Sequence, residues 1–321
     1  MSQNPVFSFH KAERKQCKAS ILIEGLTGSG KSGLALVLGK ALAGAGDYKK
    51  VFAIDTENGS LPLFSGLNSS SGGKFEDFQI GNFTPDIGYK PSHYLAFRDE
   101  AVKAGATVVI MDSISHAWQY KGGILDILND VKATSRNNNE YAAWGDPRVA
   151  KEKGLLFELL RDNRVHCITT VRVKEKMEIG TNEQGKTTVQ SLGEQQIMQA
   201  DIKYEPDLVL HMITAGTPTT PPVAKVVKSR YAMFVKGETY HFTPELCEQL
   251  RKYLEDGTSP EEIEAAQHKE YEDAVKGYLT ENANKKTLWK LILTELGYKD
   301  AKVKDLPLST LKQAYIKLTV D

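Results

Sequence analysis

The chain has few cysteines and no long hydrophobic run. Its 321 residues include only three cysteines, Cys17, Cys167 and Cys247, and no two of them form a C-x-x-C pair. Isolated thiols fit a reducing compartment and favour neither disulfide bonds nor a zinc site. No apolar run is long enough to cross a membrane, and residues 1–20 lack the apolar core of a signal peptide. We therefore expect a cytoplasmic protein with no membrane partner.

The chain also lacks an excess of charge of either sign. Its 41 Lys and Arg residues balance 41 Asp and Glu residues, and 40% of the chain is hydrophobic. This composition is typical of an ordinary globular protein. It excludes a global basic field for nucleic acid, so any contact with DNA has to come from a local patch. The length allows one large domain and a second small one.

The most informative stretch is residues 21–32, a β-branched run followed by Gly-x-x-x-x-Gly-Lys-Ser and then a helical run to residue 42. Strand, glycine-rich turn and helix start are the context that a phosphate-binding P-loop requires. Glycines let backbone N–H groups converge on phosphate oxygens, and the helix N-terminus adds partial positive charge. Lys31 is expected to reach the β- and γ-phosphates, and Ser32 to ligate Mg²⁺. The predicted nucleotide-binding residues are Gly25, Leu26, Thr27, Gly28, Ser29, Gly30, Lys31, Ser32 and Gly33.

Two further strands are predicted to end in acidic residues. Residues 107–113 form a hydrophobic run that begins 75 residues after Ser32 and carries Asp112 near its end, which is the Walker B pattern of a carboxylate that holds Mg²⁺. Residues 51–55 predict a buried parallel strand, expected to neighbour the P-loop strand, that ends in Asp55-Thr56-Glu57. Glu57 is therefore a candidate to polarise the attacking water. The alternative is an acid that only caps a turn.

Cations follow two other predicted strands. Strand 164–171 leads to Arg172, which with Thr170 stands where a γ-phosphate sensor would lie. Arg172 could equally be a surface cation. Strand 223–227 ends in Lys228-Ser229-Arg230, and two cations at a strand tip could reach a neighbouring subunit's nucleotide as fingers. The alternative is an exposed hairpin end.

Other segments carry weaker signals. We expect one helix over 114–133, then a polar break with Tyr141 and Trp144, which could stack on bases but more often pin a loop to the core. Residues 173–200 predict an extended hairpin or loop, with a turn at 182–186, that could contact DNA. Gly257 to Pro260 marks a boundary, so the predicted domains are 1–257 and 258–321.

The segment after this boundary is predicted to be a small helical module. Residues 285–317 contain eight lysines against three acidic residues, with Trp289, Tyr298 and Tyr315 interleaved. This pattern fits a nucleic-acid or partner-binding module. It also fits a helical cap whose aromatic residues form a core.

Together these elements resemble the RecA-like ATPase core. Residues 25–32 match its Walker A motif, residues 108–113 its Walker B ending, and residues 54–57 the segment with the water-activating glutamate. That placement differs from AAA+ proteins, whose glutamate directly follows Walker B, where this chain has Ser113. Lys228-Ser229-Arg230 is similar to the Lys-x-Arg finger of RadA and DnaB-type helicases. A Tyr-x-x-Trp-Gly-x-Pro loop at 141–147 is similar to one in phage-encoded RecA-core ATPases found with single-strand annealing genes.

The resemblance implies an α/β, RecA-like P-loop NTPase fold with a mainly parallel central sheet. It implies an ATP hydrolase that uses ATP and Mg²⁺ in phage DNA recombination or replication, in the bacterial host cytoplasm. Implied partners are single-stranded DNA, a single-strand annealing or SSB-type protein, and further copies in a ring or filament. Implied catalytic residues are Glu57, Lys31, Lys228 and Arg230. A non-hydrolysing nucleotide switch or loader is the alternative, and a small-substrate kinase is a third reading.

Overall fold

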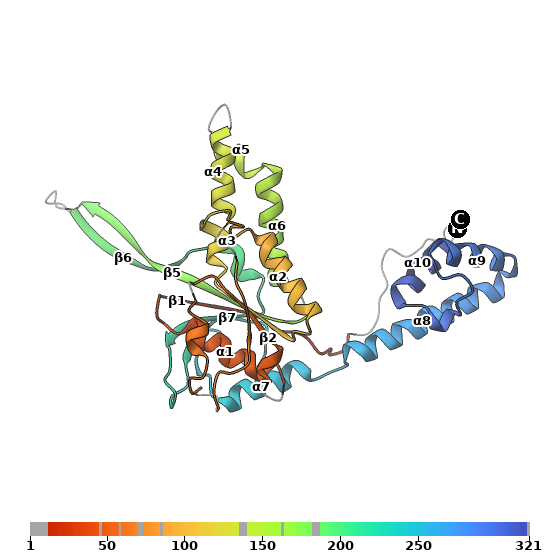
Figure 1. The fold of residues 1–321 in the computed structure, drawn as a ribbon, viewed down its shortest axis with the longest axis horizontal. Helices are drawn as coiled ribbons and strands as arrows, with labels where there is room; N and C mark the ends of the chain where they lie inside the picture. The colour runs from red at the N-terminus through yellow and green to blue at the C-terminus, as the bar shows by residue number, and fades with distance from the viewer. Residues whose placement is uncertain are drawn as a thin grey trace. The chain divides into compact units, whose positions relative to one another are not determined.

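The computed structural model contains two compact units. The first comprises residues 17–254, and the second comprises residues 12–16 together with 255–319. Figure 1 shows the central sheet and its helices in the first unit, and the helices α8, α9 and α10 in the second. The structure describes residues 12–44, 47–57, 59–69, 73–83, 86–134, 140–161, 164–181 and 187–319.

A single, mainly parallel sheet organises the first unit. Its strands run in the order β3-β2-β4-β5-β1-β7-β8-β9, with β6 paired to β5 outside this path. Pairing is parallel from β3 to β7 and antiparallel in β7-β8-β9 and β5-β6. The expected α/β fold is therefore confirmed. The strands are β1 (Ser20–Gly25), β2 (Val51–Asp55), β3 (Gln79–Gly81), β4 (Val108–Asp112), β5 (His166–Thr181), β6 (Thr187–Gln196), β7 (Leu208–Thr214), β8 (Val223–Ser229) and β9 (Thr239–His241).

Helices cover both faces of this sheet. Successive side chains of a strand point to opposite faces, so Ile21 and Ile23 join the core under α1 and α7, while Leu22 joins the core under α2, α4 and α6. Burial on both faces explains the continuous apolar runs of the sequence. The α-helices of this unit are α1 (Lys31–Leu42), α2 (Pro91–Lys103), α3 (Ser115–Gln119), α4 (Ile124–Thr134), α5 (Glu140–Trp144), α6 (Pro147–Arg161) and α7 (Pro244–Glu255). Short 3₁₀ turns are η1 (Tyr48–Lys50), η2 (Pro62–Phe64) and η3 (Ala200–Tyr204).

Strand order corrects one expectation about the sheet. β2 does not neighbour the P-loop strand β1, because β4 and β5 lie between them. The strand that carries Thr170 and Arg172 is therefore inserted between the P-loop and Asp112. Local sequence patterns cannot reveal such an order, since it depends on how distant segments pair.

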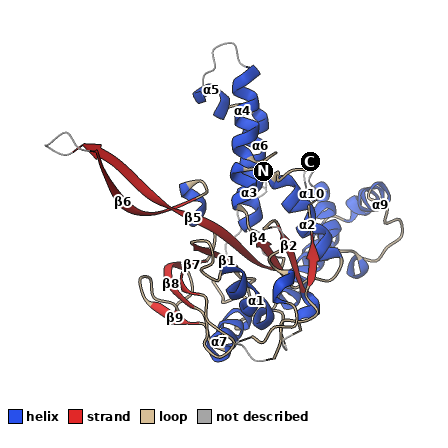
Figure 2. Cartoon of the chain, turned by 60° about the vertical axis from the view of Figure 1, so that its left-hand side comes forward, coloured by secondary structure: helices blue, strands red, loops and turns tan. Residues whose placement is uncertain are grey.

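The helix expected over 114–133 is also wrong, because it is divided into α3 and α4. Gly122 has a φ of 75°. A Cβ on Gly123 would lie 2.8 Å from the carbonyl oxygens of His116 and Tyr120. Only glycine allows this tight junction. The predicted hairpin at 173–200 is formed by β5 and β6, which project from the sheet as helices α4–α6 also do (Figures 1 and 2). Its turn at 182–186 lies outside the described residues.

The second unit is helical and has its own core. It contains α8 (Pro260–Glu281), η4 (Ala283–Lys285), α9 (Lys286–Glu295), η5 (Val303–Asp305) and α10 (Leu308–Thr319). Ser259 and Glu262 form a capping box that fixes the start of α8. Trp289 is buried in this core, and Tyr298 and Tyr315 pack against it. These aromatic residues therefore serve packing, as in the helical-cap alternative.

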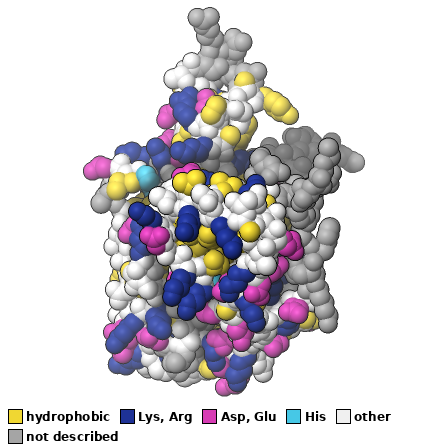
Figure 3. Space-filling view, turned by 90° about the vertical axis from the view of Figure 1, so that its right-hand side faces the viewer, with side chains coloured by type: hydrophobic (Ala, Val, Ile, Leu, Met, Phe, Trp, Pro, Cys, Tyr) yellow, Lys and Arg dark blue, Asp and Glu magenta, His cyan; other side chains and the backbone are white. Residues whose placement is uncertain are grey.

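The surface shows no separation of charge on the face drawn in Figure 3. There, basic and acidic side chains alternate with hydrophobic ones. Among the described helices, none has the length and apolar character needed to cross a membrane.

Candidate functional site

The P-loop is a tight turn between β1 and α1 that depends on glycine. Gly28 and Gly30 have φ values of 76° and 92°, a region that L-residues avoid. A Cβ on Gly30 would lie 2.4 Å from the Cα atom of Ala215, so the loop also needs glycine for close packing. The first amides of α1 have no intrahelical acceptor and remain available for phosphate oxygens.

Lys31 begins α1 and turns back onto the P-loop. Its Nζ donates to the carbonyl oxygens of Gly25, at 3.1 Å, and of Leu26, at 2.9 Å. Burial lowers the pKa of Lys31, although Glu57 and Asp112 act against this shift. The ammonium group therefore lies within the field of both carboxylates, in a place where a phosphate would stabilise its charge.

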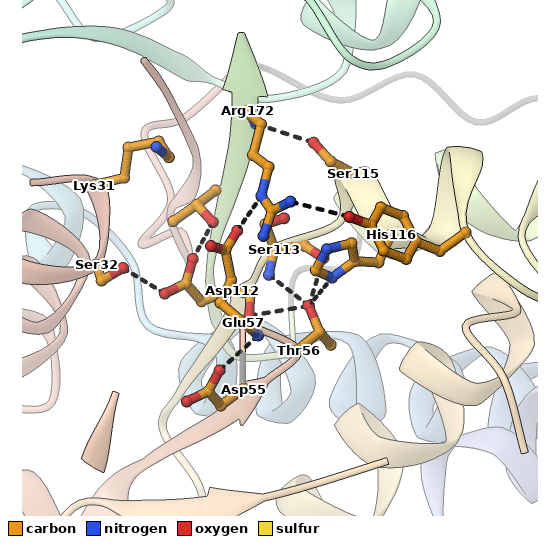
Figure 4. Close-up of polar contacts among 12 residues, drawn as sticks. Lys31, Ser32, Asp55, Thr56, Glu57, Asp112, Ser113, Ser115, His116 and Arg172 are labelled. Carbon is orange, nitrogen blue, oxygen red and sulfur yellow. Dashed lines mark hydrogen bonds and ion pairs between the residues drawn. The ribbon is translucent and has the colours of Figure 1, made fainter. Parts of the chain in front are cut away.

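Asp112 ends β4 and receives hydrogen bonds from two neighbouring elements (Figure 4). Ser32 Oγ donates to its Oδ2 at 2.5 Å, and Thr170 Oγ1 on β5 donates to its Oδ1. Asp112 is fully buried, and burial raises its pKa despite these hydrogen bonds. The predicted Mg²⁺ ligands Ser32 and Asp112 are thus brought together from segments 80 residues apart.

The carboxylates of Asp55 and Glu57 have different hydrogen-bond partners. Asp55 Oδ1 accepts from the amide of Glu57 at 2.7 Å, and its Oδ2 accepts from the amide of Leu61 at 2.8 Å. Asp55 is therefore the acid that caps this turn. Glu57 points instead toward Arg172, whose Nε lies 2.6 Å from its Oε1. Burial alone would raise the pKa of Glu57, but the hydrogen bond and charge of Arg172 outweigh it and lower the pKa.

Arg172 is a partly buried cation at the edge of the sheet, with its side chain 24% exposed. Its amide donates to Ser115 Oγ at 2.9 Å, and its guanidinium donates to the hydroxyl of Tyr120, the residue that directly follows α3. The arginine is therefore held by Glu57 from β2 and by α3. It is not the surface cation that the sequence left open as an alternative.

Comparison with known families agrees with this geometry. A family model described as an AAA domain matches residues 17–241, which is more than half of the chain. The chain belongs to the AAA domain family. No curated protein matches it. In this AAA domain Asp55 and Asp112 are neighbours in the register of the parallel strands β2 and β4. Glu57 therefore approaches Asp112 from the end of the adjacent strand, and Ser113 is the residue that directly follows Asp112.

Sequence reasoning missed the residues beneath the AAA domain's site. Thr56 Oγ1 accepts from the amide of Ser113 at 2.9 Å and lies 2.6 Å from Nδ1 of His116. Burial lowers the pKa of His116 to about 4, so this ring is neutral at pH 7. The peptide bond between Asp112 and Ser113 is cis. The sequence offered one indication of these residues: Thr56 is next to Glu57, and Ser113 is next to Asp112.

Lys228 and Arg230 lie at the opposite edge of the AAA domain's sheet. In the antiparallel pair β7–β8, Lys228 is the register partner of Val209, near the start of β7. The amide of Arg230 donates to the carbonyl oxygen of Asp207, which precedes β7. Lys228 Nζ donates to the carbonyl oxygens of Tyr204 and Pro206, and Arg230 forms an ion pair of 2.9 Å with Asp207. The structure therefore does not bring these two residues to the P-loop of their own chain.

The residues of this AAA domain fit a nucleotide with Mg²⁺. The serine hydroxyl and carboxylate at Ser32 and Asp112 are the hard oxygen donors that Mg²⁺ prefers. Ser29 Oγ is buried without a hydrogen-bond partner among the described residues, and a Cβ on Gly28 would meet only open space. In the described parts of the chain, no three His, Cys, Asp or Glu residues cluster to hold a metal. A bound Mg²⁺ would therefore need phosphate or water oxygens as its remaining ligands.

Proposed function

We propose that this protein is a Mg²⁺-dependent ATPase. The observation that carries the proposal is the meeting of Lys31, the Ser32–Asp112 pair and Glu57 at one edge of a parallel sheet. Such an edge, at the carboxyl ends of the strands, is where open α/β sheets bind ligands. Phosphoryl transfer needs positioning and charge stabilisation more than covalent chemistry, and these groups supply both.

In this proposal each residue has one task. The P-loop amides and Lys31 bind the phosphates. Ser32 and Asp112 would hold Mg²⁺, which when bound neutralises charge on the β- and γ-phosphates. Glu57 orients the attacking water once its carboxylate leaves Arg172, and Arg172 then turns to the γ-phosphate. Lys228 and Arg230 would act on the nucleotide of a neighbouring copy. Their position at the end of the sheet opposite to their own P-loop favours this role.

The finer role that we propose is ATP-driven DNA recombination or replication on single-stranded DNA, in the manner of RecA-like ATPases encoded by phages. Assembly into a ring or filament, a single-strand annealing or SSB-type partner and action in the host cytoplasm belong to this proposal. Support comes from the Walker A, Walker B and Lys-x-Arg motifs and from the hairpin β5–β6 that projects beyond Arg172. The most direct test is the ATPase rate against protein concentration, with and without single-stranded DNA.

The decisive variant is Glu57→Gln. It keeps the size of the side chain but removes the negative charge that polarises water, so we expect turnover to fall by roughly 10²–10⁴-fold while ATP binding persists. Steady-state phosphate release and equilibrium binding of labelled ATP measure the two effects. A matched control is Glu248→Gln, since Glu248 also pairs with an arginine, Arg251, but lies on α7 away from the site. Unchanged turnover in Glu57→Gln would refute the assignment of Glu57.

One observation favours the alternative of a slow or non-hydrolysing switch. Glu57 is engaged by Arg172, and Lys31 by its own P-loop, so both groups must change partners before they can act. A protein that binds ATP tightly but shows no hydrolysis at any concentration, with or without single-stranded DNA, would support the switch over the ATPase.

A further inference from the structure

A cavity lies away from the proposed nucleotide site. It has a volume of about 820 Å³, within the range of small-molecule sites, and is bordered by helices α3, α5 and α6 and by the end of β6. We call it the tryptophan pocket. None of the P-loop residues, Asp112, Glu57 or Arg172 lines it. The lining residues that matter here are Trp118, Tyr141, Trp144, Lys153, Gln195 and Gln199.

Aromatic rings form one wall of the tryptophan pocket. The rings of Trp118 and Trp144 are stacked, with centroids 6.0 Å apart and an angle of 23° between their planes. Both rings pack partly against the hydrophobic core, which fixes their position. Tyr141, in contrast, is 91% exposed. The pocket thus combines an anchored aromatic pair with an accessible ring, and flat aromatic faces of this kind stack on nucleobases.

Polar groups on the other walls suit a ligand with a hydrogen-bonding edge. Gln199 donates from Nε2 to Asp201 at 2.9 Å, but its Oε1 is buried with no hydrogen-bond partner among the described residues. A buried acceptor without a partner is costly, so a donor from a ligand would stabilise it. Lys153 Nζ lies 5.9 Å from the ring centroid of Trp144 and supplies a positive charge at the aromatic wall.

We propose that the tryptophan pocket binds an unpaired nucleobase of single-stranded DNA. The base stacks on Tyr141 and Trp144, the amide of Gln199 accepts from its edge, and Lys153 attracts a neighbouring phosphate. This inference rests on the proposed role on single-stranded DNA and assigns that role a site. Aromatic faces beside an unpaired amide oxygen suit a planar base, which can stack on the rings and donate from its polar edge at the same time.

The position of the pocket also connects it to Arg172. Trp118 lies on α3 between Ser115 and Tyr120, and both of these residues contact Arg172. On the opposite wall, Gln195 pairs with Lys174, two residues beyond Arg172 on β5. A base in the pocket therefore contacts α3, which helps to hold Arg172 beside Glu57, and β6, which pairs with β5 just beyond Arg172. Binding there should raise the rate of ATP hydrolysis.

Binding can be tested without hydrolysis. The full chain is titrated with a fluorescein-labelled oligothymidylate and with an abasic oligonucleotide of equal length and charge, and anisotropy is measured. Loss of one stacking contact predicts that Tyr141→Ala weakens oligothymidylate binding roughly five- to a hundredfold, while abasic binding is unchanged. Tyr204→Ala is the matched control, because Tyr204 is also exposed (72%) but lies outside the pocket. Lys153→Gln should weaken binding to both oligonucleotides.

Several results would overturn the proposal. Equal binding of the two oligonucleotides, or an unaffected Tyr141→Ala variant, would place DNA binding elsewhere. Quenching of tryptophan fluorescence by an acidic peptide with a terminal phenylalanine, but not by DNA, would make the occupant a protein partner. Competition by free thymidine monophosphate alone would make it a mononucleotide site. ATP hydrolysis without any DNA binding would refute the pocket and leave the ATPase intact, whereas pocket binding that persists in an inactive protein would do the reverse.

Discussion

The strands of the central sheet have a carboxyl end and an amino end, called here the carboxyl edge and the amino edge. The charged side chains at these two edges have different kinds of partner. At the carboxyl edge, Glu57, Asp112 and Arg172 are bonded to side chains from other strands or helices. At the amino edge, Lys228 is bonded to backbone oxygens, and Arg230 to Asp207 and to backbone oxygens. Strand β1 separates the edges by about 17 Å, at roughly 3.3 Å per residue. The charged groups of the first edge therefore lie together within one chain, whereas Lys228 and Arg230 lie away from them.

Burial explains why the carboxyl edge is suited to a ligand. It raises the pKa of Asp112 and lowers that of Lys31, so each group is held in a place that disfavours its charge. A metal ion near the carboxylate and phosphates near the ammonium group would reverse both effects. At the amino edge Arg230 is 57% exposed, and its ion pair costs little to exchange. The finger role that we propose for Arg230 requires such an exchange of partner, away from Asp207.

The largest effect that separates the edges should come from Arg230→Ala. If Arg230 serves a neighbouring copy as a finger, turnover falls by about a thousandfold, because a positive charge on the transferring phosphate is lost, while ATP binding stays intact. Phosphate release and labelled-ATP binding measure this. Arg148→Ala is the matched control, since Arg148 pairs with Asp146 at 3.0 Å and is 60% exposed. Equal activity of Arg230→Ala and the control would leave the amino edge without a catalytic task.

Mixing two inactive variants sharpens the same comparison. The Arg230→Ala variant keeps Glu57, and the Glu57→Gln variant keeps Arg230. In a mixture of the two, some contacts between copies therefore bring an intact Glu57 together with an intact Arg230. Activity should then return to a fraction of the wild-type value. Failure to recover, in proteins that still bind ATP and associate, would argue that the fingers do not act between copies.

A smaller effect should come from Arg172→Ala at the carboxyl edge. Loss of one positive group near the γ-phosphate should lower turnover by roughly 10²-fold. It should also change the pH profile. Arg172 lowers the pKa of Glu57, which keeps the carboxylate charged at acidic pH. Without the arginine, burial raises this pKa, so the acidic limb of the pH–rate profile should move to higher pH. Arg172→Lys should move it less, and an unchanged limb would separate Glu57 from the chemistry.

The sequence predicted what local patterns can specify. The P-loop, the strands of residues 51–55 and 108–112 and the turn after Asp55 all depend on neighbouring residues. The Ser32–Asp112 contact was predictable because carboxyl ends of parallel strands meet at one edge. The break between α3 and α4 also has a local cause, the glycine pair Gly122-Gly123, because glycine is unfavourable inside a helix.

Contacts that depend on strand order could not be predicted. Glu57 and Arg172 are 115 residues apart, and they meet only because β5 lies between β1 and β4. The tryptophan pocket joins α3, α6 and the end of β6 for the same reason. Sequence patterns indicate which face a side chain takes, but not which distant strand becomes its neighbour.

The smallest predicted effect concerns pH and stability at the carboxyl edge. His211 on β7 lies 3.3 Å from the buried Glu24 and 3.3 Å from Glu194, with Lys203 on the other side of Glu24. The hydrogen bond to Glu24 raises the pKa of His211 above its usual 6.5. Its contribution to the free energy of unfolding is therefore complete below about pH 6.5 and is lost as the pH rises through the higher folded-state pKa.

We accordingly expect His211→Gln to lower the free energy of unfolding by about 1 kcal/mol at pH 6 and by much less at pH 9. Urea unfolding of the full chain at several pH values measures this difference, and His241→Gln, at an exposed histidine of β9, is the control. A deficit that stays constant or grows with pH would show that His211 is not held as a cation.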